Sequence, residues 1–190
     1  MAAAAAQAMV VGDPALLERF DVGNTVCQGG FAQVARATDV LQGTHCAVKK
    51  IHRAQFESFV GERSTERMLA MCDILEGEQN DNAARILYAS ADDQSIYVVM
   101  PWIDGDTLFS YSYTHPLPRA HIKAIMRGIC EALKFLHEKQ LVHRDVKEDN
   151  LIVTVDASGN ARVVLIDFDL CVRVCDAERL REPPGHFPHM

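Results

Sequence analysis

The segment "LVHRDVKEDNLIV", which begins at Leu141, contains the side chains best suited to chemistry. It places Asp145, Lys147 and Asn150 in a short charged stretch between two apolar runs. A carboxylate can accept a proton from an attacking hydroxyl, an ammonium group can stabilise a transferring phosphoryl group, and an amide oxygen can bind a hard cation such as magnesium. The segment therefore predicts a catalytic loop, with a solvated turn between a helix and a strand as the simpler alternative.

A further carboxylate, Asp167, comes directly after the apolar run "VVLI". It supplies the anionic oxygen ligand that magnesium prefers. Phosphoryl transfer needs positioning, cation bridging and one weak base, and Asp167 together with the charged segment provides each of these. The hypothesis is that this chain transfers phosphoryl groups.

Two features of the first half could bind phosphates. Gly29 and Gly30, in "VCQGGFAQV", would let backbone amides approach an anion, although glycine pairs also occur in ordinary hairpin turns. Lys49, in "CAVKK", lies on a predicted strand, where a lysine usually faces solvent. A functional role for Lys49 requires a carboxylate within reach of its ammonium group. Glu66 is the best candidate for this carboxylate, and Glu62 is the fallback.

The elements that must position these residues follow from the spacing of apolar residues. Residues 55–75, rich in Glu, Arg, Met and Leu, suit a helix. Strands are predicted at 20–38 (two strands), 44–51, 84–91 and 95–102.

The second half is led by a predicted helix at about 119–138. A hairpin follows, with strands 151–155 and 161–166 around the turn 156–160. A strand-rich half followed by a helix-led half predicts an α+β chain in two lobes, joined near residues 102–108. The apolar stripe of the long helix comprises Ile122, Ile125, Met126, Ile129, Leu133 and Leu136.

Five motifs in order, "GGFAQV", "AVK", Glu66 in its helix, "HRDVKEDN" and "IDFD", resemble those of the eukaryotic protein kinase family, serine/threonine type. The resemblance runs from about Phe20 to the last residue. It implies the two-lobe protein kinase-like fold, with a complete N-terminal β-rich lobe and an incomplete C-terminal helical lobe. The expected divisions are a low-complexity leader at 1–17, a nucleotide-binding lobe at 18–103 and a partial C-terminal lobe at 104–190.

The resemblance also implies roles for the candidate residues. Asp145 would be the catalytic base, with Lys147 beside it, and Asn150 and Asp167 would hold Mg²⁺. Lys49, paired with Glu66, would contact the phosphates of ATP together with Gly29 and Gly30.

Residues between the lobes would bind the rest of the nucleotide. Met100 resembles the gatekeeper, residues 101–103, ending at Ile103, resemble the hinge against adenine, and Asp106 lies where the family often binds the ribose. The implied cofactors are ATP and Mg²⁺, and the implied partner is a protein substrate with a Ser or Thr acceptor.

Several positions depart from the family pattern. Cys27 and Ala32 stand where the glycine loop usually has glycine, and Asp169 replaces the glycine of the metal motif. The last residues, "GHFPHM", resemble the start of the family's "GTxxYMAPE" segment, so the sequence predicts a domain truncated within the activation segment. Two alternatives stay open: a small-molecule phosphotransferase of the aminoglycoside or choline kinase type, and a pseudokinase-like nucleotide-binding or scaffold module.

Composition excludes other classes of function. The net charge of −7 disfavours a nonspecific nucleic-acid binder, which needs a basic face. The N-terminus lacks the positively charged start of a secretory signal, and no run approaches the roughly 18 apolar residues of a membrane span. These features, with six scattered cysteines that form no CxxC pair, favour a cytoplasmic or nuclear protein.

Overall fold

The computed structural model describes residues 8–176, which form two compact units. Among these residues the first unit comprises 8–77 and 86–102, and the second comprises 78–85 and 103–176. The main boundary, after Trp102, differs by one residue from the expected one. The sequence did not predict that residues 78–85 belong to the second unit. Residues 177–190, which include the segment "GHFPHM", lie outside the described range.

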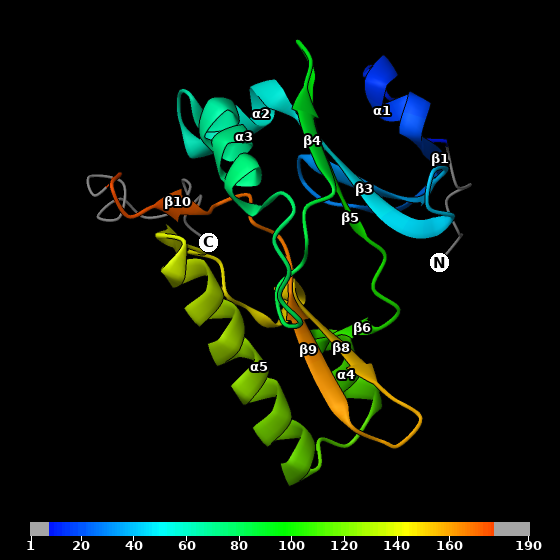
Figure 1. Ribbon diagram of the computed structural model, residues 1–190, viewed down its shortest axis with the longest axis vertical. Helices are drawn as coiled ribbons and strands as arrows, with labels where there is room; N and C mark the ends of the chain where they lie inside the picture. The colour runs from blue at the N-terminus through cyan, green and yellow to red at the C-terminus, as the bar shows by residue number, and fades with distance from the viewer. Residues whose placement is uncertain (1–7, 177–190) are drawn as a thin grey trace. The chain divides into compact units, whose positions relative to one another are not determined.

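The first unit is built on a five-stranded antiparallel sheet in the order β1-β2-β3-β5-β4 (Figure 1). β3 lies at its centre and is buried over most of its length, since β-branched and other apolar residues cover both faces. The strands are β1 (Phe20–Gln28), β2 (Ala32–Asp39), β3 (Thr44–His52), β4 (Tyr88–Ala91) and β5 (Ser95–Pro101).

The predicted strand at 84–91 is too long at its start, because β4 begins only at Tyr88. Ala84 and Arg85 belong to the second unit instead. There Ala84 donates its amide to the carbonyl of Leu165 at 2.8 Å, and Leu165 donates to the carbonyl of Asn82 at 2.7 Å. Tertiary hydrogen bonding therefore takes part of the apolar run away from the sheet.

The predicted helix at 55–75 is two helices, α2 (Arg53–Val60) and α3 (Ser64–Leu75). The break lies at Gly61, whose φ of 108° is left-handed backbone that favours glycine, and Arg63 follows with a φ of 60°. In Figure 1 these two helices lie to one side of the sheet and α1 (Pro14–Arg19) to the other.

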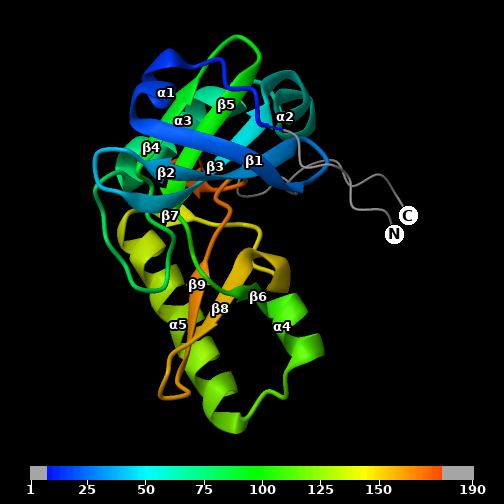
Figure 2. The same ribbon diagram turned by 90° about the vertical axis from the view of Figure 1, so that its right-hand side faces the viewer.

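Residues before the first strand pack into the core of the first unit. Met9 and Leu16 are buried in one cluster with Phe20, Val48 and Tyr97. The leader was expected to extend to residue 17. The structure instead includes Met9 and Leu16 in the core of the first unit. Figure 2 shows α1 against the same sheet from a second direction.

The second unit combines two helices with short strands. Its three-stranded sheet has the order β6-β8-β9, and β7 pairs with β10. The hairpin predicted around residues 156–160 is confirmed by the pairing of β8 with β9. The elements are β6 (Asp106–Thr107), α4 (Leu108–Thr114), α5 (Arg119–Glu138), β7 (Leu141–Val142), the 3₁₀ helix η1 (Glu148–Asn150), β8 (Leu151–Val155), β9 (Ala161–Leu165) and β10 (Val172–Arg173).

The helix predicted at 119–138 is confirmed as α5, which packs against β9. Its buried face is narrower than the predicted stripe and runs through Ile125, Gly128, Ala132 and Leu136. A side chain at Gly128 would collide with Val163, so glycine allows this close approach. Of the predicted stripe, Ile122 and Met126 are exposed.

No helix within residues 8–176 is long and apolar enough to cross a membrane.

Candidate active site

The charged segment of the second unit is a loop fixed by a buried histidine. His143 follows β7 and is 1% exposed. Its Nε2 lies 3.1 Å from the carbonyl oxygen of Ile166, and its Nδ1 accepts the backbone amide of Asp145 at 3.2 Å. These partners require a proton on Nε2 and none on Nδ1. Burial lowers the pKa of His143, which keeps the imidazole neutral in this arrangement.

Asp145 lies at the centre of a hydrogen-bond network. Its Oδ2 accepts from Lys147 Nζ at 2.7 Å and from Asn150 Nδ2 at 2.8 Å. Asn150 Nδ2 also donates to the backbone carbonyl of Asp145 at 2.9 Å. The hydrogen bond to Asp145 raises the pKa of Lys147, so the ammonium group stays charged beside the carboxylate. The network brings together three residues that the sequence predicted as one site.

Asp167 reaches the same region from the neighbouring strand. The β8–β9 ladder pairs Leu151 with Leu165, and the amide of Ile166 donates to the carbonyl of Asn150 at 2.9 Å. Asp167 follows directly, and its Oδ1 accepts the backbone amide of Asp169 at 3.3 Å. The pairing of two strands thus explains why residues 17 positions apart form one candidate site.

The replacement of glycine by Asp169 causes no conflict in this conformation. Residue 169 is not among the described residues with positive φ, so an L-amino acid fits without strain. Asp167 itself has a φ of 66°, and Arg144, on the other side of the site, has a φ of 69°. Such conformations are sparsely populated by residues other than glycine and often mark functional positions.

The donor atoms of this site fit a magnesium ion. Both amide protons of Asn150 are used by Asp145, which leaves the amide oxygen as its remaining polar atom. This oxygen and the carboxylate of Asp167 are the hard ligands that magnesium binds, usually with waters and phosphate oxygens completing the shell. Within residues 8–176 no cluster of three or more His, Cys, Asp or Glu could hold a metal by itself.

Two of the predicted nucleotide residues, Lys49 and Met100, share one face of the sheet. Lys49 is opposite Val98 on β5 and Val34 on β2, and Met100 is opposite Ala47. Because side chains two residues apart point the same way, Lys49 and Met100 lie on the same face. Lys49 is only 8% exposed. The result is an apolar surface with one buried cation, facing away from the cluster that contains Val48.

The β1–β2 turn contains Gly29 and Gly30. The amide of Gly29 donates to the carbonyl of Ala32 at 2.7 Å, which closes the turn. Neither glycine has a positive φ. An added Cβ would make only an ordinary 3.7 Å contact at Gly29 and no contact within 4 Å at Gly30. The turn itself thus gives no steric reason for glycine at residue 30.

Glu66 lies in the first turn of α3 with an exposed side chain. Its negative charge contributes to the raised pKa of Arg53, after the larger effects of the hydrogen bond and charge of Glu57. The pairing of Glu66 with Lys49 remains a prediction.

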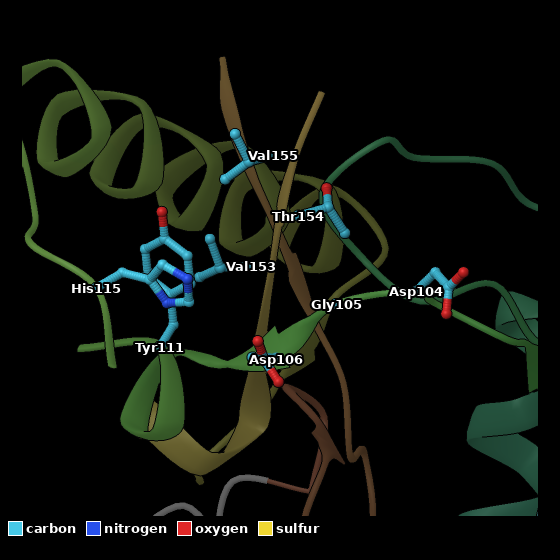
Figure 3. A pocket seen from close by; sticks show the side chains of 8 residues that line it. All are labelled: Asp104, Gly105, Asp106, Tyr111, His115, Val153, Thr154 and Val155. Atoms are coloured by element: carbon cyan, nitrogen blue, oxygen red, sulfur yellow. The ribbon is translucent and has the colours of Figure 1, made fainter. Parts of the chain in front are cut away.

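Asp106 and Ile103 belong to the second unit. Asp106 is exposed on β6 and borders a pocket of ≈ 340 Å³. Figure 3 shows Tyr111 and His115 on one side of β8 and Asp104 on the other. The ribose and hinge roles of Asp106 and Ile103 remain predictions. The lining residues are Asp104, Gly105, Asp106, Tyr111, His115, Val153, Thr154 and Val155.

Sequence reasoning missed the structural role of His143 and the apolar neighbours of Lys49. The neighbours could have been found, because strand alternation around "CAVKK" places Ala47 and Lys49 on one face. The role of His143 could not have been found in this way, because its hydrogen-bond partner Ile166 is 23 residues away in the sequence.

The described residues thus include a sheet with a buried lysine in one unit and a loop with a carboxylate network in the other. A family model, described as protein kinase domain, matches residues 20–186. The chain belongs to the protein kinase domain family. The α+β fold class predicted from the sequence is confirmed.

Two curated relatives show how far the similarity extends. The chain is 28% identical over 144 residues to "Probable serine/threonine-protein kinase mkcC" of Dictyostelium discoideum, a match that covers 76% of this chain and 15% of that protein. It is 27% identical over 171 residues to "Serine/threonine-protein kinase PAK 1" of Mus musculus, covering 90% of this chain and 29% of that protein. The chain thus spans less than a third of the length of these relatives.

Proposed function

We propose that this chain is the ATP-dependent catalytic domain of a protein serine/threonine kinase, which transfers the γ-phosphoryl group of ATP to a protein hydroxyl. The observation that carries the proposal is the network in which Asp145 accepts from Lys147 and Asn150. A carboxylate, an ammonium group and an amide oxygen held together are the parts that phosphoryl transfer needs from a protein.

Asp145 is the base that accepts the proton of the attacking hydroxyl. Its backbone is held by His143 and its side chain by Lys147, so the carboxylate is oriented before the substrate arrives. Lys147 stabilises the negative charge of the transferring group, and the raised pKa of Lys147 keeps it protonated.

Asn150 and Asp167 hold the metal ion. When bound, Mg²⁺ neutralises charge on the phosphate oxygens of ATP. The chain's own contribution is to fix the two ligands, Asn150 through its hydrogen bonds to Asp145 and Asp167 through the β8–β9 ladder. Asp169 supports Asp167 with a backbone hydrogen bond.

Lys49, Gly29 and Gly30 bind the phosphates of ATP, with Glu66 as the partner of Lys49. Met100 and the apolar residues on the same sheet face receive the adenine, Ile103 contributes to the hinge, and Asp106 binds the ribose. Support comes from the shared face of Lys49 and Met100 and from the open space at Gly30.

The preference for Ser and Thr is supported by Lys147, which lies beside the base, and by the names of both relatives. The experiment incubates the full chain with Mg²⁺ and γ-labelled ATP. One set of reactions contains peptide libraries whose only hydroxyl is Ser, Thr or Tyr, and a second contains small aminoalcohols.

Label on Ser and Thr peptides, lost on chelation of the metal, is the expected result. Label confined to the small molecules would identify a small-molecule phosphotransferase. Saturable Mg-ATP binding without transfer to any acceptor would identify a pseudokinase-like binding module. Either of the last two results contradicts the proposal.

A further inference from the structure

The tip of the β1–β2 turn carries an aromatic side chain, Phe31, that packs on α2. Its ring centroid lies 6.0 Å from that of Phe56 and 5.6 Å from that of Phe59. Phe56 is fully buried, so this surface is part of the core of the first unit. The backbone of the tip is held as well, because the amide of His52 donates to the carbonyl of Phe31 at 2.9 Å.

Helix α2 is itself fixed to its surroundings. At its first residue, the amide of Arg53 donates to the carbonyl of Gln94 in the β4–β5 turn at 2.9 Å. Its Glu57 accepts from Arg53 Nε at 3.0 Å and from Thr65 Oγ1 of α3 at 2.7 Å. A side chain that packs on α2 is therefore connected to the sheet and to α3.

We propose that Phe31 is a positioning residue for the nucleotide loop. With Phe56 and Phe59 it forms an aromatic clamp that holds Gly29 and Gly30 in place before ATP binds. The inference rests on the proposed function, in which these two glycines approach the phosphates. Glycine gives a turn many accessible conformations, and the clamp limits them by fixing the residue that follows.

Ordering a loop in advance reduces the entropy lost when a ligand binds. Loss of the clamp should therefore weaken nucleotide binding in the ground state and in the transition state alike. Such a change raises KM and leaves kcat unchanged. A merely structural defect would instead lower the amount of active protein, and hence the apparent kcat, without moving KM.

The decisive variant is Phe59→Ala, because Phe59 lies on α2, outside the loop, and its ring contacts Phe31. We expect the Kd for Mg-ATP and the KM for ATP to rise roughly 3- to 10-fold, the scale of one aromatic contact in an equilibrium constant, with kcat preserved. Phe59→Leu should restore part of the affinity. Phe109→Ala, an exposed phenylalanine on α4, is the matched control and should leave both values unchanged.

The double variant Phe31→Ala/Phe59→Ala tests whether the two rings act together. Its effect on the Kd should be smaller than the product of the two single effects, because each single change already breaks the shared contact. Independent effects, or an unchanged Kd in Phe59→Ala, would overturn the clamp.

A measurement without nucleotide separates this inference from the proposed function. Amide hydrogen exchange of the full chain should be faster at His52 and Gly29 in Phe59→Ala than in the wild type. If the wild type fails to bind Mg-ATP, the proposed function fails, and the exchange result alone decides whether the clamp exists. Equal exchange in the two proteins would show that it does not.

Discussion

Gly30 is a glycine that the described fold does not require. Its φ is not in the left-handed region, and an added Cβ would meet nothing within 4 Å. Gly43 offers a contrast, since it has equal space but a φ of 67°. Backbone strain explains glycine at Gly43, whereas at Gly30 the free space itself is the feature that a phosphate could use.

Comparing the variants Gly30→Ala and Gly43→Ala distinguishes a glycine that leaves space for a phosphate from a glycine that avoids backbone strain. We expect Gly30→Ala to keep or raise stability, by up to about 1 kcal/mol, and to weaken Mg-ATP binding by about 10-fold or more. Gly43→Ala should lose about 1 kcal/mol of stability and bind ATP normally. Thermal melts and calorimetric titration measure both. Normal ATP affinity in Gly30→Ala would remove this argument for a phosphate at the turn.

We expect the stability that His143 contributes to depend on pH. Burial lowers its pKa below the ordinary value of 6.5, so the folded form keeps the ring neutral while the unfolded chain protonates it. The stability that His143 contributes is therefore fully present above pH 6.5 and is lost as the pH falls through and below that value.

The variant His143→Gln tests this sign. At about pH 7.5 it should be less stable than the wild type by about 1–3 kcal/mol, because two buried backbone groups lose well-placed partners. At about pH 5.5 the difference in stability between the two proteins should narrow. Protonation of His143 in the unfolded chain lowers the stability of the wild type there, and the variant has no imidazole to protonate. Urea unfolding at the two pH values gives both numbers, and a constant difference would contradict the assignment.

At the scale of elements, the segment before β1 is tied to the far edge of the sheet. Asp13 caps α1 by accepting the amides of Ala15 and Leu16, and its other oxygen accepts the hydroxyls of Tyr88 and Ser90 on β4. Burial alone would raise the pKa of Asp13, but these hydrogen bonds together lower it.

Replacing Asp13 should therefore destabilise the first unit. We expect Asp13→Ala to cost about 2–3 kcal/mol, from a lost helix cap and two hydroxyls left without their acceptor. Asp21→Ala, which removes an exposed aspartate from β1, is the control and should cost less than about 0.5 kcal/mol. Denaturant unfolding compares the two, and equal small losses would mean that the segment is not held as described.

Helix α5 presents apolar residues on a face that the described residues do not cover. Ile122 is 48% exposed and Met126 is 54% exposed. We expect the 190-residue chain to bind a hydrophobic dye, and the double variant Ile122→Lys/Met126→Lys to bind clearly less. Fluorescence titration is the measurement. Absence of dye binding by the wild type, in a monodisperse sample, would show that this face is covered.

At the scale of the whole chain, the strands β1, β2, β3 and β5, the β8–β9 hairpin and α5 could be predicted because their signals are local. Short, nearly continuous apolar runs indicated β3 and β5, and a 3.6-residue repeat indicated α5. The break between α2 and α3 was missed because it depends on backbone angles at Gly61 and Arg63. The docking of residues 78–85 on β9 was missed because it depends on hydrogen bonds to residues about 80 positions away.

The candidate site divides in the same way. Spacing within one segment identified Asp145, Lys147 and Asn150, and the structure brings these three together. The contacts of His143 and the packing of Phe31 on α2 join residues distant in sequence, which no local pattern encodes. The exposed position of Glu66 likewise depends on how α3 packs.

The predicted residues are divided between the units, with Lys49, Gly29 and Gly30 in the first and Asp145 in the second. Loss of the base should therefore affect transfer and spare nucleotide binding. The central test is Asp145→Asn in the full chain, with Asp149→Asn, an exposed aspartate of the same loop, as the control.

The measurement is the rate of phosphoryl transfer from Mg-ATP to a Ser or Thr peptide, made together with the Kd for Mg-ATP on the same samples. The account predicts that Asp145→Asn loses about 10²- to 10⁴-fold in kcat, the usual contribution of a general base, with a Kd within about twofold of the wild type. The control should match the wild type in both values. Turnover by Asp145→Asn at the wild-type rate would contradict the account.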